Sequence, residues 1–516
     1  MNLPRVGLLS AAVAMVLMCA AAASPGQSGA GVTHVEVDAR GAGTPLPHFW
    51  EEMFGSGRAI LTLRQSYRDD LRTVKAATGF KYVRFHGIFH DEVGLFDLDA
   101  QGKPVYNFSY IDQIYDGLLQ NGVKPFVELS FTPKKLASDP AALHAFWYKQ
   151  NVSPPKDYGM WDDMIRQFTR HLVERYGEAE VATWYFEVWN EPNIDFWVGK
   201  PAQSTYFELY DHTARAIKAV NPRLSVGGPS TAQAAWAGDF LAHCKANNVP
   251  VDFVSNHVYA NDTATDVFKT DENIPRDRMV CRAVKKVHEE IAASAYPNMP
   301  FILSEYNASY ANEPNVTDST YMGPWLADTI RQCDGLATMM SYWSFSDVFE
   351  EQGVVKTPFY GGFGVVAVDS IPKPALNAFT MLHKLGETRL AVDSDSALAT
   401  KRKDGAVVMA LWNYAGPDGT GDKYTPPPAD LGAVKRFEVD VKGVGATTAT
   451  VWRLDRDHGN VVKAFDAMGR PPFPSREQIA ALQAAGKMAA AEKIAVRGGK
   501  FALSVPAQGL VVVELR

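Results

Sequence analysis

Eight short apolar runs alternate with amphipathic stretches between residues 45 and 387, and this alternation is the strongest constraint on the fold. Strand-like runs that alternate with helical ones predict a parallel sheet, and eight of them predict a (β/α)8 barrel. A doubly wound open sheet is the alternative, but its Gly-rich first turn is only partly matched by residues 54–59. The expected barrel strands are residues 49–54, 82–86, 125–131, 183–190, 225–228, 253–259, 301–305 and 339–345.

The helical segments show the periodicity that a barrel of this kind needs. Residues 160–177 and 276–292 each carry an apolar stripe at spacings of three and four, which predicts one buried face. A third segment, 373–386, begins just after Pro372 and stops at Gly386, as the chemistry of helix ends favours.

After Gly386 the pattern changes to short alternating runs separated by turns rich in Gly, Pro and Asp. This pattern predicts a small antiparallel β-sandwich. Residues 33–38 alternate in the same way, so we expect the sandwich to combine residues 32–44 with 388–516. An Ala-rich stretch within 471–490 predicts a helical insertion in this unit.

The first 24 residues predict an export signal. Arg5 supplies a positive charge, residues 6–19 are apolar, and Ala20 to Ala23 offer small residues for cleavage. Cys19 raises the alternative of a lipoprotein anchor, although Met18 is a poor fit to the small residue that lipoprotein processing requires. We therefore expect an exported protein, periplasmic or secreted, with no membrane span.

Charge and cysteine content argue against several classes of protein. A net charge of −7 gives no basic footprint for nucleic acid. Cys244, Cys281 and Cys333 are an odd, scattered set, so we expect three small buried side chains and not a disulfide framework. Metal-binding spacings are missing and the glycine-rich run at 361–364 lacks a phosphate-loop Lys, so the sequence predicts neither metal nor cofactor.

Two glutamates stand where expected strands end, at the rim that carries the active site of a barrel. Glu191 follows an apolar run at 184–190, and Glu305 follows another at 301–304. A carboxylate in such a setting is costly or has a shifted pKa, so a pair of them needs a chemical reason. The reason we favour is a catalytic pair that cleaves a glycosidic bond; a salt bridge or a helix-capping role for Glu191 is the alternative. Glu128 and Glu187 lie inside strands and are expected to be structural, with Glu128 paired to an Arg or Lys.

Several motifs, taken together, resemble one known family. Trp189-Asn190-Glu191-Pro192 and Ser304-Glu305-Tyr306 resemble the retaining glycosidases that carry glutamates on barrel strands four and seven. Within that clan the chain is similar to glycoside hydrolase family 39, the family of β-xylosidases and α-L-iduronidases. Further motifs of the resemblance cover nearly the whole mature chain, at residues 55–59, 84–87, 186–197, 257–259, 342–351 and 361–374.

The resemblance implies that Glu191 is the general acid/base and Glu305 the nucleophile. It implies sugar contacts from Asn190, at the 2-hydroxyl, and from His86, His257, Tyr259, Trp343, Glu350, Glu351, Tyr310 and Phe131. The alternative for His86 and His257 is that they are barrel histidines satisfied by internal hydrogen bonds. In this clan the bond after the strand-eight tryptophan is often cis, so we expect a strained or cis Trp343–Ser344 peptide.

The expected substrate is a β-xyloside or xylo-oligosaccharide, from which xylose is released at the non-reducing end. In the iduronidase branch a Lys is expected two positions after the strand-six His, where this chain has Tyr259. Glu350 and Glu351 would also repel a uronate. An α-L-arabinosidase, a β-galactosidase-like or endo-acting enzyme, and an α-L-iduronidase are alternatives. An inactive sugar-binding protein is a remote one, because both glutamates are present.

Overall fold

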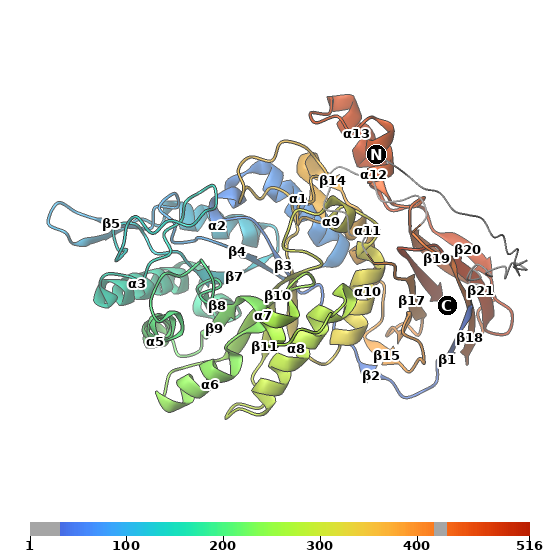
Figure 1. Cartoon of the computed structure of the whole chain (residues 1–516), viewed down its shortest axis with the longest axis horizontal. Helices are drawn as coiled ribbons and strands as arrows, with labels where there is room; N and C mark the ends of the chain where they lie inside the picture. Colours follow the sequence, from blue (N-terminus) through green and yellow to red (C-terminus); the bar gives the residue numbers. More distant parts are fainter. Residues whose placement is uncertain (1–30, 417–430) are drawn as a thin grey trace, which may run out of the picture.

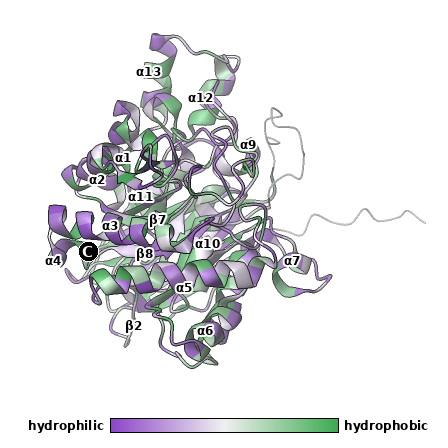
Figure 2. Cartoon of the chain, turned by 90° about the vertical axis from the view of Figure 1, so that its left-hand side faces the viewer, coloured by the Kyte–Doolittle hydropathy of each residue, from purple (hydrophilic) through white to green (hydrophobic). Residues whose placement is uncertain are grey.

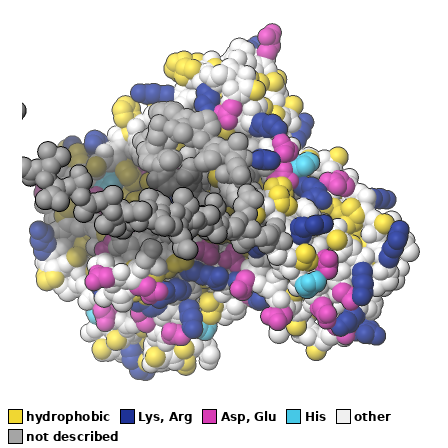
Figure 3. Space-filling view, turned by 45° about the vertical axis from the view of Figure 1, so that its right-hand side comes forward, with side chains coloured by type: hydrophobic (Ala, Val, Ile, Leu, Met, Phe, Trp, Pro, Cys, Tyr) yellow, Lys and Arg dark blue, Asp and Glu magenta, His cyan; other side chains and the backbone are white. Residues whose placement is uncertain are grey.

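The computed structural model describes residues 31–416 and 431–516 of the chain. The expected export signal, residues 1–24, lies outside the described residues. Figure 1 shows two bodies side by side, a barrel with its helices and a unit of antiparallel strands that contains the C-terminus. Figure 3 shows that Lys and Arg side chains are interspersed with Asp and Glu on the face it presents.

Eight parallel strands close into a barrel, which confirms the predicted (β/α)8 architecture with its accessory sandwich. The barrel strands are β3 (Met53–Gly55), β4 (Tyr82–Phe85), β7 (Lys124–Leu129), β8 (Tyr185–Val188), β9 (Ser225–Thr231), β10 (Phe253–Tyr259), β11 (Phe301–Asn307) and β12 (Met339–Tyr342). The main helices that follow them are α1 (Gln65–Thr78), α2 (Ser109–Gln120), α3 (Tyr158–Tyr176), α5 (Ala202–Val220), α6 (Ala237–Ala246), α8 (Arg276–Ala292), α10 (Met322–Cys333) and α11 (Pro374–Leu382).

Local sequence chemistry sets the ends and the buried faces of these helices. The Asp157 side chain accepts a hydrogen bond from the Met160 backbone N–H at 3.0 Å and so caps α3. Helix α11 has Pro374 in its first turn, where a missing N–H costs nothing. In Figure 2 hydrophilic and hydrophobic residues alternate along α3 and α5, as expected for helices that cover a barrel with one face. The buried side chains of α3 are Trp161, Met164, Ile165, Phe168, Thr169 and Leu172.

The interior of the barrel is layered along its axis. Side chains alternate across each strand, so every second residue points inward. The amino-terminal end is closed by an apolar cluster of Met53, Phe126, Phe253, Ile302 and Met339. Two residues further along β4 and β7, the inward positions are the fully buried Arg84 and the buried Glu128. The polar layer therefore rests on an apolar plug and leads toward the carboxyl-terminal rim.

The sandwich is assembled from both ends of the described chain. β1 (Val32–Asp38) pairs in parallel with β18 (Lys435–Lys442), which also pairs with β21 (Lys500–Val505). The facing sheet has the order β2-β15-β16-β17-β22-β19-β20. Its strands are β2 (Thr44–Pro45), β15 (Thr388–Leu390), β16 (Ala397–Lys401), β17 (Val407–Asn413), β22 (Gly509–Leu515), β19 (Thr448–Leu454) and β20 (Glu492–Ala495). Val35, Val439, Met409 and Val513 belong to the shared core of the two sheets.

A pair of short helices, α12 (Val461–Ala467) and α13 (Arg476–Ala485), lies between β19 and β20. Their apolar residues Val461, Phe465 and Leu482 pack with Phe359 and other residues of the barrel side. The insertion therefore contacts the barrel. The remaining short elements are η1 (Ala59–Leu63), β5 (Phe96–Leu98), β6 (Pro104–Tyr106), α4 (Glu178–Val181), η2 (Ala232–Ala234), α7 (Ala264–Phe268), α9 (Pro314–Thr317), β13 (Val366–Ala367), η3 (Val368–Ser370) and β14 (Ile371–Pro372).

The prediction for the cysteines is wrong at two of the three positions. Cys281 on α8 and Cys333 on α10 form a disulfide across a sequence separation of 52 residues, with their Cα atoms 5.2 Å apart. These helices are consecutive on the outside of the barrel, so they lie side by side, a relation that an odd count of cysteines does not reveal. Cys244 is buried and free, as expected.

Within residues 31–416 and 431–516, none of the helices combines the length and apolar character needed to cross a membrane.

Candidate active site

A cavity of about 260 Å³ opens at the carboxyl-terminal rim of the barrel. Pockets for drug-sized ligands span roughly 300–1,000 Å³, so this cavity suits a ligand of one or two rings. Eight of the predicted site residues line it directly, and His257 contacts both glutamates from behind. The eight are His86, Asn190, Glu191, Tyr259, Glu305, Tyr310, Trp343 and Glu351.

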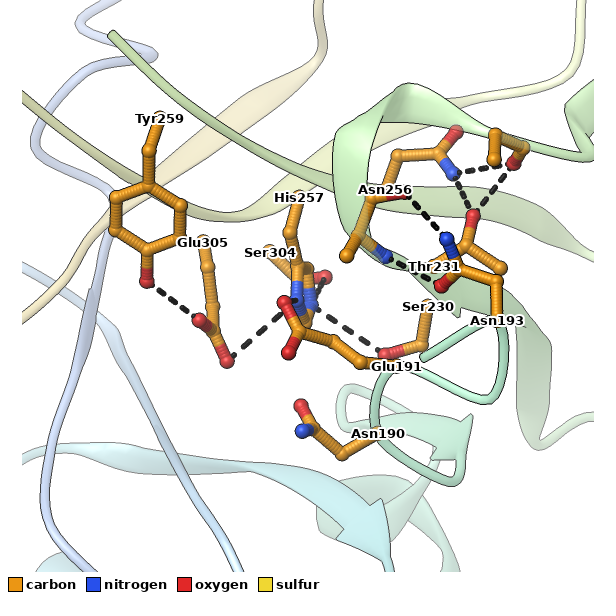
Figure 4. Close-up of polar contacts among 12 residues, drawn as sticks. Asn190, Glu191, Asn193, Ser230, Thr231, Asn256, His257, Tyr259, Ser304 and Glu305 are labelled. Atoms are coloured by element: carbon orange, nitrogen blue, oxygen red, sulfur yellow. Dashed lines mark hydrogen bonds and ion pairs between the residues drawn. The ribbon is translucent and has the colours of Figure 1, made fainter. Parts of the chain in front are cut away.

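The two predicted catalytic glutamates lie close together. Glu191 comes three residues after the end of β8, and Glu305 lies within β11. Three atoms lie within 4.8 Å of one another: a carboxylate oxygen of Glu191, a carboxylate oxygen of Glu305 and a ring nitrogen of His257. Figure 4 shows the side chains of Glu191 and Glu305 converging on His257. Trp189 and Glu191 have φ values of 74° and 47°, a left-handed backbone that non-glycine residues rarely adopt and that recurs at functional sites.

Arg84 is the centre of the charged layer beneath the cavity. Its guanidinium donates to Glu187 at 2.6 Å and to Glu305 at 2.6 Å, and it lies 2.8 Å from Glu128. The Arg84 side chain is fully buried, so these carboxylates supply the compensation that a buried charge requires. Both interior glutamates have the structural role expected for them. Arg84 also donates to the side-chain oxygen of Asn190 at 3.0 Å, which leaves the Asn190 amide nitrogen available to a ligand.

The environments of the two glutamates favour different protonation states. Burial raises the pKa of Glu191 well above its usual range, and the charge of Glu305 raises it further. Burial also raises the pKa of Glu305, but Arg84, His86 and the Tyr259 hydroxyl oppose the rise. That hydroxyl donates to Glu305 at 2.6 Å. Glu305 is therefore the carboxylate of the pair, and Glu191 holds the proton.

Two histidines orient these groups from opposite sides. Burial, together with Arg84 and His86, lowers the pKa of His257 well below its usual value, so its ring is neutral. Its Nδ1 lies 3.0 Å from Glu191 and its Nε2 lies 3.1 Å from the Ser304 hydroxyl. For His86, burial would lower the pKa, but the Glu128 carboxylate 2.7 Å away outweighs burial and raises it.

Glu351 faces the cavity, and no Lys or Arg of the described residues forms an ion pair with it. Its nearest charged neighbour is His86, whose Nε2 lies 3.7 Å away. Burial raises the pKa of Glu351 to about 8. At neutral pH this side chain therefore carries a proton and is able to donate a hydrogen bond to a ligand hydroxyl.

Two of the predicted sugar contacts do not lie at the cavity. Glu350 forms ion pairs with Arg58 at 3.3 Å and with Arg64, so both its oxygens are engaged outside the cavity. Its φ of 65° turns the chain, which explains why adjacent glutamates face different environments. Phe131 is fully buried and packs edge-on against Trp189 with ring centroids 5.4 Å apart, behind the cavity wall.

Trp343 forms part of the cavity wall, and its bond to Ser344 is cis, as predicted. The position of its ring explains the glycine in the first strand. A Cβ on Gly55 would lie 2.0 Å from the Cε3 atom of Trp343, so only glycine permits this close approach. His86 lies on the other side of the tryptophan, with ring centroids 4.8 Å apart.

Sequence reasoning missed several residues of the site. Arg84 belongs to a motif of the family resemblance, but no role in the site is predicted for it, although a charged residue in an apolar strand is the same signal that points to the glutamates. Asp262 and Gln233 lie in loops after β10 and β9, where the sequence carries no comparable signal. The other lining residues absent from the prediction are Phe146, Ile194, Phe196, Ala232, Thr263, Asp266 and Phe363.

Two clusters among the described residues could offer ligands to a metal ion. One is the catalytic pair with His257. In the other, Glu51 Oε1 lies 2.5 Å from His48 Nδ1 and 2.8 Å from His383 Nδ1. Ligand atoms around a tetrahedral zinc ion are about 3.3 Å apart, so the spacing of this second cluster is that of hydrogen bonds.

Comparison with known proteins agrees with this geometry. The model for glycosyl hydrolases family 39 matches residues 33–499. A β-xylosidase of Geobacillus stearothermophilus is 38% identical over 469 residues, which cover 88% of this chain and 90% of that protein. A β-xylosidase of Caldicellulosiruptor saccharolyticus is 35% identical, with 85% and 88% covered. Human α-L-iduronidase is 28% identical over 49% of this chain and 39% of its own length.

Solved structures extend the likeness to the whole fold. The crystal structure of a monomeric β-xylosidase from Caulobacter crescentus CB15 superposes with a TM-score of 0.84 at 36% identity, covering 94% of this chain and 99% of that one. A family 39 enzyme from Xanthomonas axonopodis pv. citri gives 0.83 at 33% identity, covering 94% and 97%. The chain belongs to glycosyl hydrolase family 39 and is a glycosidase.

Proposed function

We propose that this glycosidase releases xylose from the non-reducing ends of β-xylosides by double displacement. The observation that carries the proposal is the approach of the two carboxylates to within 4.8 Å. Carboxyl groups about 5–5.5 Å apart are typical of retaining enzymes, whereas inverting enzymes need about 6.5–9.5 Å to admit a water.

The first step uses the two protonation states described above. The Glu305 carboxylate attacks the anomeric carbon while the bond to the leaving oxygen breaks, and Glu191 gives its proton to that oxygen. The sugar becomes an ester of Glu305, so the negative charge of that side chain is lost. The pKa of Glu191 then falls, because the neighbouring charge that raised it has gone.

The second step reverses these roles. Glu191, now a carboxylate, takes a proton from water as the water oxygen attacks the anomeric carbon and the ester bond breaks. Glu305 is restored as a carboxylate and Glu191 as an acid. Asn190 is suited to bind the sugar 2-hydroxyl through its free amide nitrogen, a contact that strengthens in the transition state.

The charge of the cavity supports a neutral sugar. Among the described residues that line it there is no Lys or Arg, whereas five carry carboxyl groups: Glu191, Asp262, Asp266, Glu305 and Glu351. A uronate carboxylate would find no Lys or Arg in this lining and would be repelled by the ionised Glu305, and Arg84 beneath is already surrounded by carboxylates. The β-xylosidases of 35–38% identity support xylose as the sugar.

The test is the anomeric form of the first product. Proton NMR of 4-nitrophenyl β-D-xyloside hydrolysis should show β-xylose before mutarotation, and initial α-xylose would contradict double displacement. A parallel assay with an α-L-iduronide should show far slower turnover. Faster cleavage of the iduronide would overturn the sugar assignment.

We also propose that the protein is exported to the periplasm or beyond. The Cys281–Cys333 disulfide supports this, because disulfides persist in oxidising compartments. Cell fractionation followed by N-terminal sequencing should find a mature chain that begins near residue 25. A full-length chain in the cytoplasm would contradict export.

A further inference from the structure

The cavity has two sides, which the chemistry of the reaction distinguishes. Glu191 must face the leaving oxygen, since it protonates that atom. Glu305 and the residues that contact it lie on the side of the sugar that is attacked. Groups beside Glu191 and away from Glu305 therefore flank the leaving group. The end of β9 and the turn that follows it form such a group, because the Ser230 carbonyl accepts a hydrogen bond from the backbone N–H of Glu191 at 2.8 Å.

We propose that residues 230–236, the end of β9 with η2 and the two residues after it, form a subsite for the leaving sugar of a xylo-oligosaccharide and that Gln233 hydrogen-bonds its hydroxyls. This segment is called the loop below. This inference rests on the proposed function and assigns a ligand to one part of the same cavity. Gln233 lines the cavity and is partly exposed. No hydrogen bond joins its side chain to another described residue, so the carboxamide is available to a ligand.

The backbone of this loop is held in an unusual shape. Ser230, Gln233, Ala234 and Trp236 have φ values of 55°, 60°, 49° and 63°. Four non-glycine residues in the left-handed region within seven positions are costly, and such a segment persists only where its surroundings fix it. The shape is therefore maintained by contacts outside the loop, and it fixes the position of Gln233.

Asn193 provides the first of these contacts. Its side-chain oxygen accepts from the Ala232 N–H at 2.9 Å and its amide nitrogen donates to the Ala232 carbonyl at 3.0 Å. Figure 4 shows this reciprocal pair next to Glu191. Asn193 lies two residues beyond the acid/base, so one short segment fixes both Glu191 and the position next to Gln233.

The other side of the loop is fixed by β10 and α8. The Asn256 amide nitrogen donates to the Thr231 hydroxyl at 2.6 Å and to the Ala235 carbonyl at 3.0 Å. Lys286 of α8 donates to the Ala234 carbonyl at 2.8 Å. The residues on both sides of Gln233 are thus bonded to the protein, whereas its own side chain faces the cavity unpaired.

The exposed lining suits a second sugar. A carboxamide offers a donor and an acceptor, which matches a hydroxyl that does both. Tyr310 and Ile194 line the same cavity and are 55% and 36% exposed, so they offer apolar surface to the C–H face of a sugar ring. An aryl leaving group has a flat apolar ring but lacks the hydroxyls that Gln233 would bind.

The experiment compares kcat/KM for xylobiose and for 4-nitrophenyl β-D-xyloside in the Gln233→Ala enzyme. We expect kcat/KM for xylobiose to fall about 5–10-fold, as for loss of a neutral hydrogen bond, with less than about a twofold change for the aryl xyloside. Gln233→Gly removes the same side chain but suits the left-handed backbone. It should show the same selective loss, even where Gln233→Ala is poorly folded.

The matched control is Asn248→Ala, which removes an exposed amide from another left-handed position, with φ of 49°, outside the cavity. It should leave both substrates unchanged. Equal losses on both substrates in Gln233→Gly, or an unchanged rate on xylobiose, would overturn the subsite. Wild-type enzyme that cleaves neither xyloside would instead overturn the proposed function.

Discussion

Two fully buried cations, Arg84 and Lys373, hold carboxylates inside this molecule, and they serve different purposes. Arg84 contacts Glu128, Glu187 and Glu305, the last of which faces the cavity. Lys373 contacts Asp318 at 2.6 Å and Asp347 at 2.7 Å, and both carboxylates are buried away from the catalytic cavity. Similar ion clusters therefore occur at the catalytic cavity and in a second place that is closed to that cavity.

The closed cluster works through the backbone of a turn. Asp318 accepts from the Gly361 N–H at 2.6 Å, Asp347 accepts from the Gly364 N–H at 2.7 Å, and Lys373 donates to the Gly362 carbonyl at 2.9 Å. The turn between them carries Phe363, which lines the cavity. A buried carboxylate can therefore take part in the reaction only where it faces space for a substrate. Asp318 and Asp347 do not line the catalytic cavity, and there they hold the turn in place.

Glu305→Ala breaks the reactive cluster and should have the largest effect. Without the nucleophile, kcat on 4-nitrophenyl β-D-xyloside should fall by about 10⁴-fold or more, as for loss of other covalent catalysts. Stopped assays with long incubation times measure the low kcat of the variant, and thermal unfolding shows whether it is folded. Glu52→Ala, at the opposite end of the barrel, is the matched control and should keep full activity. A residual rate within tenfold of wild type would contradict the nucleophile.

Glu191→Ala should have an effect that depends on the leaving group. With xylobiose, which needs protonation, kcat should fall about 10²–10⁴-fold. With a dinitrophenyl xyloside, which leaves unaided, the first step should be much less affected. Equal losses on both substrates would reject the acid/base role.

The same variant makes a prediction about pH. Wild-type activity should fall as pH drops through the pKa of Glu305, because the nucleophile is protonated. It should fall again as pH rises through the raised pKa of Glu191, because the acid loses its proton. In Glu191→Ala the alkaline fall should disappear for the dinitrophenyl substrate. If the alkaline fall in activity persists in this variant, a group other than Glu191 causes it.

Lys373→Met breaks the closed cluster and should act mainly on stability. It leaves two buried carboxylates without a cation, a change that costs about 3–5 kcal/mol of unfolding free energy. Denaturant unfolding measures the loss, and kcat of the folded fraction should fall less than tenfold. A catalytic loss larger than that, with unchanged stability, would show that the two clusters are not separate.

The Cys281→Ser/Cys333→Ser double variant sets a baseline away from both clusters. The disulfide closes a loop with a separation of 52 residues, so its removal should cost about 2–4 kcal/mol of stability. Because it lies on the outer helices, kcat and the pH profile should stay unchanged. Dithiothreitol treatment of the wild type should reproduce the stability loss. A changed pH profile would link this face to the cavity.

Much of the fold could be predicted, because barrel strands are apolar, short and separated by helices. Strand positions were correct to a few residues. The prediction for the first barrel strand is the least accurate. Phe49 and Trp50 are apolar and buried, but they lie in the segment before β3. The sandwich was also predictable from alternation. Pairs of residues that meet from distant elements, such as Cys281 and Cys333, could not be predicted from these patterns.

The site also contains residues that local sequence can predict and residues that it cannot. Glu191 and Glu305 are detectable because a carboxylate after an apolar strand is physically unusual. Glu350 and Glu351 are neighbours with the same chemistry, yet Glu350 pairs with Arg58 and Arg64 while Glu351 lines the cavity. Gln233 depends on a loop whose shape is fixed by residues from three other elements. No local pattern encodes such an arrangement.

The most direct test of the paired carboxylates is to trap the covalent intermediate. Incubation with a 2-deoxy-2-fluoro xylosyl fluoride, followed by intact mass and peptide mapping, should show one added sugar on Glu305. The adduct should decay when a xyloside acceptor is supplied. A protein that turns over xylosides but carries no adduct, or carries it on another residue, would contradict the account.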